Sequence, residues 1–190
     1  KVFINLNGKL NYGKENSITV AVNNDYGKNK VPFGNSFDWP NDGGIIRKAS
    51  LIVSNKPTTA YIHATPQLNV IDSSGKLKIK IGFENLTNKD IELAIVVTEE
   101  NQPTNNIILE KTAKPEWQNK EAIVELSFPK IHPWHFDFPN LYRIDVTVLN
   151  RKKATDKIST TIGFREVKFV DGKTFLNGER VKLMGVEWTA

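Results

Sequence analysis

Apolar and polar residues alternate with a period of two through most of this chain, and the period of an amphipathic helix is nearly absent. Five runs between residues 77 and 164 carry the pattern: Leu77, Ile79, Ile81 and Phe83; Ile91, Leu93, Ile95 and Val97; Ala122, Val124, Leu126 and Phe128; Tyr142, Ile144, Val146 and Val148; Ile158, Thr160, Ile162 and Phe164. Alternation of this kind is the mark of strands that bury one face. We therefore predict an all-β chain.

Turn residues separate the predicted strands at even intervals. Residues 72–75 and 85–89 are rich in Asp, Asn, Ser and Gly, and the basic residues 151–153 stand between two strand patterns as a hairpin tip. Strands spaced in this way over about 100 residues predict a two-sheet immunoglobulin-like sandwich, here without a disulfide because the chain has no cysteine. Tyr142 opens a late strand, as either the corner tyrosine of such sandwiches or an ordinary core tyrosine.

Shorter strand patterns flank this central region. Residues 18–22 and 49–53 each predict a strand, residues 56–59 predict a junction, and we place a domain boundary near residue 63. In the tail, residues 167–169 and 175–176 predict short strands, with tight turns at 171–172 and 177–178. Residues 181–186 predict a fresh apolar strand, so we expect a further domain to follow in a parent protein.

The composition and charge pattern limit the kinds of partner that the chain is expected to bind. The net charge is +5, but the lysines are scattered along the chain, which indicates solvated strand faces and no nucleic-acid partner. The sequence has no long apolar run, so no membrane segment is expected. The absence of cysteine leaves the redox compartment open, and a periplasmic or secreted location is an expectation for the parent only.

The sequence carries no convincing catalytic, metal or cofactor motif. His132 and His135 are three residues apart, but Pro133 argues against a helix and no third ligand is near in sequence, so we expect no metal site. Neither the dinucleotide nor the P-loop glycine pattern occurs, so no cofactor is expected. Glu99 and Glu100 lie at a strand end, where we expect both to face water at a turn.

Residues 37–47 are the strongest candidate for a binding site. This segment holds Asp38, Trp39, Asn41 and Asp42 beside a glycine pair. Carboxylate and amide groups bind hydroxyl-rich ligands, an indole stacks on a sugar face, and glycine accepts φ > 0. The alternative is a tight loop in which Trp39 is core and the polar residues satisfy turn amides.

Residues 12–24, 38–47, 133–142 and 163–186 hold four motifs whose order along the chain resembles that in glycoside hydrolase family 2, the β-galactosidase, β-glucuronidase and β-mannosidase group. Residues 38–47 resemble the segment that closes its sugar-binding jelly roll, and residues 12–24 resemble a strand entry of that jelly roll. Residues 133–134 and 139–142 are similar to the tryptophan and proline-x-leucine-tyrosine signature of its immunoglobulin-like domain. Residues 163–166, 175–179 and 183–186 are similar to the passage into its catalytic (β/α)₈ barrel.

The resemblance implies a fold and a function. Residues 1–63 would be the C-terminal part of the jelly roll, 64–163 the immunoglobulin-like sandwich, and 164–190 the lead-in to a missing barrel. Asp38 matches a substrate-pocket aspartate, with Asn41 as a weaker companion in binding sugar hydroxyls. The family's two catalytic glutamates lie late in the barrel, and no Asn-Glu pair occurs in this sequence.

We therefore expect a non-catalytic fragment of a retaining exo-glycosidase, inactive by itself, whose carbohydrate substrate binds through the missing barrel. Among parent activities, β-galactosidase comes first, then β-mannosidase and β-glucuronidase. The alternative is a stand-alone carbohydrate-binding or structural β-sandwich module. Exposed edges of a truncated jelly roll also predict an edge-strand dimer of the fragment.

Overall fold

The computed structural model describes residues 4–23, 43–53, 57–86, 88–100 and 106–186. The chain divides into two units: one comprises Lys1–Ile52 and Trp188–Ala190, and the other is Val53–Glu187. Every regular element of the described residues is a β-strand, and these strands pair with antiparallel neighbours. The predicted all-β class is therefore confirmed.

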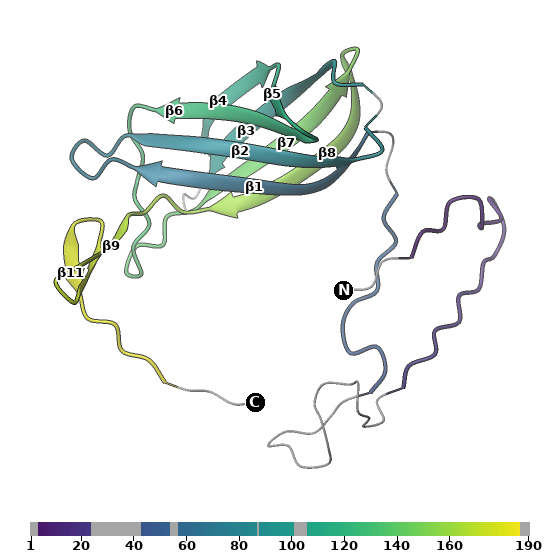
Figure 1. Cartoon of the computed structure of the whole chain (residues 1–190), viewed down its shortest axis with the longest axis horizontal. Coiled ribbons are helices and arrows are strands. Elements are labelled where there is room, and N and C mark those ends of the chain that lie inside the picture. Colours follow the sequence, from purple (N-terminus) through teal and green to yellow (C-terminus); the bar gives the residue numbers. More distant parts are fainter. Residues whose placement is uncertain (1–3, 24–42, 54–56, 87, 101–105, 187–190) are drawn as a thin grey trace. The chain divides into compact units, whose positions relative to one another are not determined.

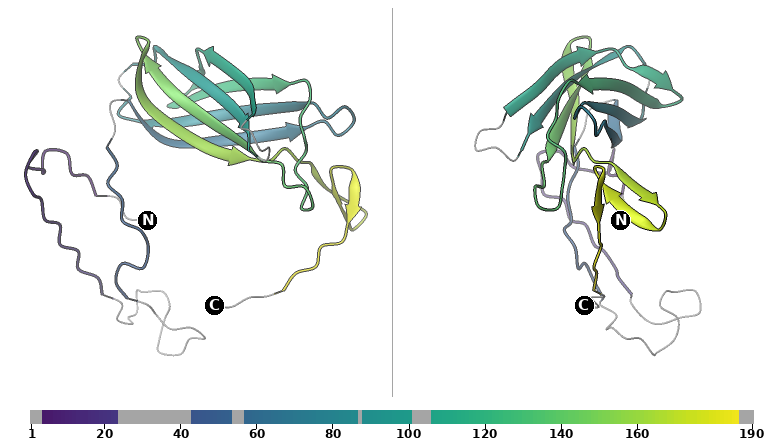
Figure 2. Two further views of the ribbon diagram at one scale, coloured as in Figure 1. Left: turned by 180° about the vertical axis from the view of Figure 1, so that it is seen from behind. Right: turned by 90° about the vertical axis from the view of Figure 1, so that its left-hand side faces the viewer.

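Two four-stranded sheets form a sandwich in the Val53–Glu187 unit (Figures 1 and 2). The first sheet has the order β1 (Thr58–Leu68), β2 (Gly75–Glu84), β6 (Glu121–Phe128) and β5 (Glu116–Gln118). The second has the order β4 (Asn106–Ala113), β3 (Ile91–Glu99), β7 (Tyr142–Asn150) and β8 (Lys153–Ile162). This order matches the A-B-E-D and C-F-G arrangement of the immunoglobulin fold, with β4 added beside strand C.

A three-stranded meander follows the sandwich. It consists of β9 (Val167–Val170), β10 (Lys173–Leu176) and β11 (Glu179–Val181), paired in the order β11-β10-β9. Asp171 and Asn177 take positive φ angles of 48° and 51° in its two hairpin turns, and a glycine with positive φ follows each. These are the conformations that the predicted Asp-Gly and Asn-Gly turns require.

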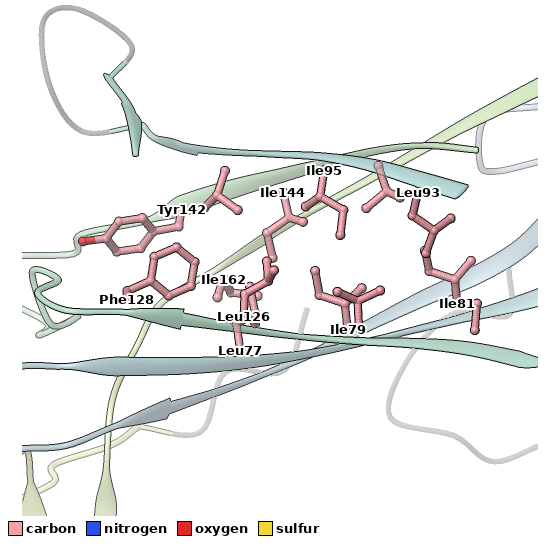
Figure 3. Packing of buried hydrophobic residues seen from close by; sticks show 14 of the residues in the cluster. Leu77, Ile79, Ile81, Leu93, Ile95, Leu126, Phe128, Tyr142, Ile144 and Ile162 are labelled. Atoms are coloured by element: carbon pink, nitrogen blue, oxygen red, sulfur yellow. The ribbon is translucent and has the colours of Figure 1, made fainter. Parts of the chain in front are cut away.

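The core lies between the two sheets (Figure 3). The predicted inward residues of β2, β3, β6 and β7 are all buried, and Ile81, Leu93, Ile95, Ile144 and Val146 have no exposed surface. Alternate residues point to opposite faces of a strand, which explains why the period-two pattern predicted these positions. Fully burying such side chains contributes about 1.5–3 kcal/mol each.

Two hydrogen bonds join the edge strand β1 of the first sheet to the edge strand β8 of the second. The backbone amide and the hydroxyl of Thr59 on β1 both donate to Asp156 Oδ2 on β8, each at 2.7 Å. Hydrogen bonds to a charged carboxylate are shorter and stronger than those between neutral groups. This contact fixes the start of β1 against the second sheet.

Three predicted strands are wrong or shorter than expected. Residues 18–22 and 49–53 form no strand, and Ile18, Val20 and Ile52 are 59%, 51% and 72% exposed. The strand predicted over residues 181–186 ends with β11 at Val181, and residues 182–186 are exposed. Residues 18–22 alternate with a period of two, and residues 49–53 and 181–186 are rich in apolar residues. However, no neighbouring strand among the described residues supplies the backbone hydrogen bonds that a longer strand requires.

β1 passes through residue 63, where the sequence predicted the domain boundary. The domain limits 1–63, 64–163 and 164–190 remain a prediction, as does the assignment of residues 1–63 to a jelly roll.

Candidate functional site

The predicted sugar-binding residues Asp38 and Asn41, together with Trp39, lie outside the described residues. The described end of their segment, residues 43–47, has no regular structure. Gly44 takes φ 88° there, the left-handed conformation that glycine favours. Ile45 and Ile46 are 64% and 67% exposed.

A polar cluster of Glu99, His132 and Tyr142 lies at one end of the sandwich. Glu99 is the last residue of β3, Tyr142 is the first of β7, and His132 belongs to the connection between β6 and β7. His132 Nδ1 is 2.7 Å from Glu99 Oε1, and the Tyr142 hydroxyl is 3.3 Å from the same oxygen. The backbone amide of His132 donates to the Tyr142 hydroxyl at 2.8 Å.

Glu99 corrects a sequence-based expectation. We expected it to face water at a turn, but only 4% of its surface is exposed. Tyr142 and Glu99 are paired across β7 and β3, which brings the hydroxyl and the carboxylate to the same buried end. A buried carboxylate needs hydrogen-bond partners, and His132 and Tyr142 provide them.

Tyr142 has the geometry of a corner tyrosine. Its hydroxyl bonds back to the backbone of His132, ten residues upstream, across the connection that precedes its strand. Burial is the largest cause that raises the pKa of Tyr142 to about 12, so the phenol stays neutral at physiological pH. We infer that the Glu99 cluster holds the β6–β7 connection against the ends of β3 and β7.

His132 and His135 serve separate contacts. His132 faces Glu99, whereas His135 Nδ1 accepts from the Asp137 amide at 3.2 Å and its ring stacks on Phe136 with centroids 3.9 Å apart. In the ranges that the structure describes, no three His, Cys, Asp or Glu side chains are grouped so that they could hold a metal ion. His135 Nε2 is buried without a hydrogen-bond partner.

Two of the four sequence motifs meet at Trp134, where the sandwich joins the meander. The Trp134 amide donates to Phe164 O at 2.8 Å, and a Cβ on Gly163 would lie 2.7 Å from the Trp134 Cβ. The Arg165 guanidinium lies 5.2 Å from the centre of the indole. Only glycine at residue 163 permits this approach.

Asn177 completes this junction from the meander side. Its side-chain amide donates to Trp134 O at 2.9 Å, and its Oδ1 accepts from the Glu166 amide at 2.9 Å. The Asn177 amide in turn donates to Glu166 O at 2.8 Å. Sequence reasoning predicted Asn177 only as a turn residue, since a contact 43 residues away leaves no local pattern.

Two open clefts lie on the sandwich. One, of about 550 Å³, lies along the β1 and β8 edges and is lined by Ala64, Pro66, Leu141, Thr161, Ile162, Gly163, Arg165 and Val167. The other, of about 770 Å³, lies at the opposite end, between the β2–β3 and β5–β6 connections. Neither includes a residue of the Glu99 cluster.

Among the described residues, no helix is long and apolar enough to cross a membrane.

Known proteins resemble the chain along most of its length. It is 29% identical over 181 residues to a β-galactosidase of Thermoanaerobacter pseudethanolicus, a match that covers 93% of this chain and 24% of that protein. It is 28% identical over 176 residues to a putative β-glucuronidase of Formosa agariphila, covering 90% of this chain and 20% of that protein. The chain thus spans about a quarter or less of the length of these relatives.

Solved structures share the fold. The β-glucuronidase of Parabacteroides merdae superposes with a TM-score of 0.57 at 24% sequence identity, over 67% of this chain and 16% of that one. The family model of the glycosyl hydrolases family 2 matches residues 60–165, more than half of the chain and nearly all of the sandwich. The chain therefore belongs to glycosyl hydrolases family 2.

Proposed function

We propose that this chain is a non-catalytic part of a retaining exo-glycosidase that removes terminal β-glycosides, with β-galactosides as the first candidate substrate. The observation that carries the proposal is the family match over residues 60–165 in a chain that covers only 24% and 20% of its relatives. Those relatives are named β-galactosidase and putative β-glucuronidase. The carbohydrate substrate is thus the expected partner of the whole enzyme.

In this proposal, the chemistry belongs to residues outside this sequence. Retaining glycosidases use two carboxyl groups about 5–5.5 Å apart, one as nucleophile and one as acid and base. The described residues show no such pair in a cleft: the Glu99 carboxylate is occupied by His132 and Tyr142. The sandwich would hold the catalytic part in place, and Asp38 and Asn41 would bind sugar hydroxyls at its pocket.

Hydrolysis of nitrophenyl glycosides tests whether the catalytic residues lie outside this chain. The 190-residue chain alone should not hydrolyse the β-galactoside, β-glucuronide or β-mannoside. A polypeptide extended with the downstream reading frame, about 250 residues or more for a barrel, should hydrolyse the β-galactoside fastest. A stop codon directly after residue 190, or hydrolysis by the 190-residue chain, would overturn the proposal.

Asp38→Ala tests the substrate contact in the extended enzyme. Loss of a charged hydroxyl acceptor should lower kcat/KM by roughly 10- to 100-fold, which corresponds to about 1.5–3 kcal/mol. Asp42→Ala removes the same charge four residues away and is the matched control. Equal activity of the two variants would refute the role of Asp38.

A stand-alone carbohydrate-binding or structural module is the second candidate. It is favoured by the self-contained core of the Val53–Glu187 unit. The downstream reading frame separates it from the first candidate. The predicted edge-strand dimer is tested by light scattering of the purified chain, and a monomer would contradict it.

A further inference from the structure

Tyr61 presents a fixed aromatic ring on the outer face of the first sheet. The side chain is 47% exposed, and its hydroxyl donates to Glu121 Oε1 at 2.6 Å. The ring lies against Gly82 on β2, where a Cβ would overlap Tyr61 Cε1 and Cζ. The β1–β2 register shifts between Thr59 and Tyr61, and such irregularities commonly re-aim a side chain.

The larger cleft begins on β2 at Phe83, the residue after the Gly82 that the Tyr61 ring covers. Its lining consists of Phe83, Glu84, Asn85, Leu86, Asn88, Lys89, Asn119 and Lys120. Glu84 follows Gly82 by two residues on the same face of β2, a separation of about 7 Å. Glu121, which holds the Tyr61 hydroxyl, directly follows the Asn119–Lys120 turn, and it is paired with Gly82.

The apolar floor of the cleft is well packed. Phe83 is only 6% exposed and packs on Trp117 with ring centroids 5.9 Å apart. The Trp117 indole donates to Lys89 O at 3.1 Å, and the Lys89 ammonium lies 5.3 Å from the indole centre. The indole therefore ties the β2–β3 connection to the β5–β6 hairpin.

Exposed polar groups line the rim. Asn85 and Asn119 hold left-handed φ angles of 53° and 56°, and both residues are exposed, as is Glu84. A carboxamide both donates and accepts, and a carboxylate accepts from hydroxyl groups. Glu84 opposes the charge of Lys120, and the Lys89 ammonium lies over the Trp117 indole. Half of the polar lining consists of the neutral carboxamides of Asn85, Asn88 and Asn119, which favours a neutral ligand.

We propose that the surface formed by Tyr61, Glu84, Asn85 and Asn119 binds a neutral sugar residue. An exposed tyrosine offers an amphipathic face to a sugar ring, and the amide and carboxylate groups bind its hydroxyls. The surface would add a second carbohydrate contact to the sandwich. It does not depend on which glycoside the parent enzyme hydrolyses.

Backbone amide NMR of the full chain tests the proposal, with methyl β-galactoside and cellobiose as neutral probes and inorganic phosphate as the anionic probe. At least one sugar should shift the resonances of Tyr61, Asn85 and Asn119 with a Kd of about 1–10 mM. Shifts with phosphate alone would overturn the proposal, and so would the absence of sugar-induced shifts at these residues.

Variants identify the groups involved. Tyr61→Ala should weaken binding by roughly 10-fold, and the double variant Asn85→Gly, Asn119→Gly by roughly 5-fold or more, because glycine keeps both left-handed turns while the carboxamides are lost. Asp171→Gly changes another left-handed turn, in the meander, and should bind like the unmodified chain. Unchanged binding in both cleft variants would refute the assignment, and their amide spectra show directly whether each remains folded.

Discussion

Removal of the Tyr142 hydroxyl should weaken the sandwich more than the size of one oxygen atom suggests. Tyr142 is 1% exposed, and its hydroxyl accepts from the His132 amide at 2.8 Å while it lies 3.3 Å from Glu99 Oε1. In Tyr142→Phe, the amide loses its acceptor and the buried carboxylate loses a donor. An unsatisfied buried donor costs about 1–3 kcal/mol.

We expect Tyr142→Phe to lower the free energy of unfolding by about 2–3 kcal/mol, since the contact with Glu99 is long and adds little. For a domain of this size the melting temperature should fall by roughly 6–12 °C. Urea unfolding followed by the fluorescence of Trp117 and Trp134 measures the change, and an unaltered m value would show that the unfolded state is unaffected.

Tyr61→Phe is the matched control for this measurement. It also removes one hydroxyl, but from an exposed hydrogen bond to Glu121, where water replaces the lost partner. We therefore expect a change in the free energy of unfolding much smaller than that of Tyr142→Phe. If Tyr142→Phe cost no more than Tyr61→Phe, the Glu99 cluster would not fasten the β6–β7 connection.

Three further predictions concern stability. Burial raises the pKa of Tyr142 to about 12 from an ordinary value of 10.0, so its contribution to stability is complete below about pH 10 and is lost as pH rises toward 12, by roughly 2–3 kcal/mol. Urea unfolding across this range should show a smaller loss in Tyr142→Phe. Gly163→Ala should cost about 1–3 kcal/mol because its Cβ would lie 2.7 Å from the Trp134 Cβ, and a melting temperature equal to that of the unmodified protein would contradict this. Ile95→Ala, at a residue with no exposed surface, should cost about 2–5 kcal/mol in urea unfolding, whereas Ile107→Ala at 56% exposure should cost far less.

The sequence predicted the sandwich well because its signals are local. Ile79 and Ile95 lie on strand faces that the period of two identifies directly, and the turn at Asn177 follows from an Asn-Gly pair. The same period over residues 18–22 was not sufficient, since a strand also requires a partner that supplies backbone hydrogen bonds.

The contacts that sequence reasoning missed join distant parts of the chain. Glu99 resembles an ordinary strand-end acid until β7 places Tyr142 beside it, 43 residues away. Gly82 interrupts the outer face of β2, and that glycine was the one available sign of the Tyr61 ring that covers it. Asp38 and Asn41 were predicted from family resemblance and remain predictions.

The meander has a consequence for the opening motions of the protein. In β9 all four residues are exposed, and Leu176 is the one buried apolar residue among its described strands. Segments with few buried contacts open at a lower free energy than the core of the same domain. In hydrogen exchange, the amides of β9 and β11 should therefore exchange through local opening, while those of β3 and β7 should exchange only on global unfolding. The hydrogen bonds of Asn177 to Trp134 and Glu166 would then oppose the local opening.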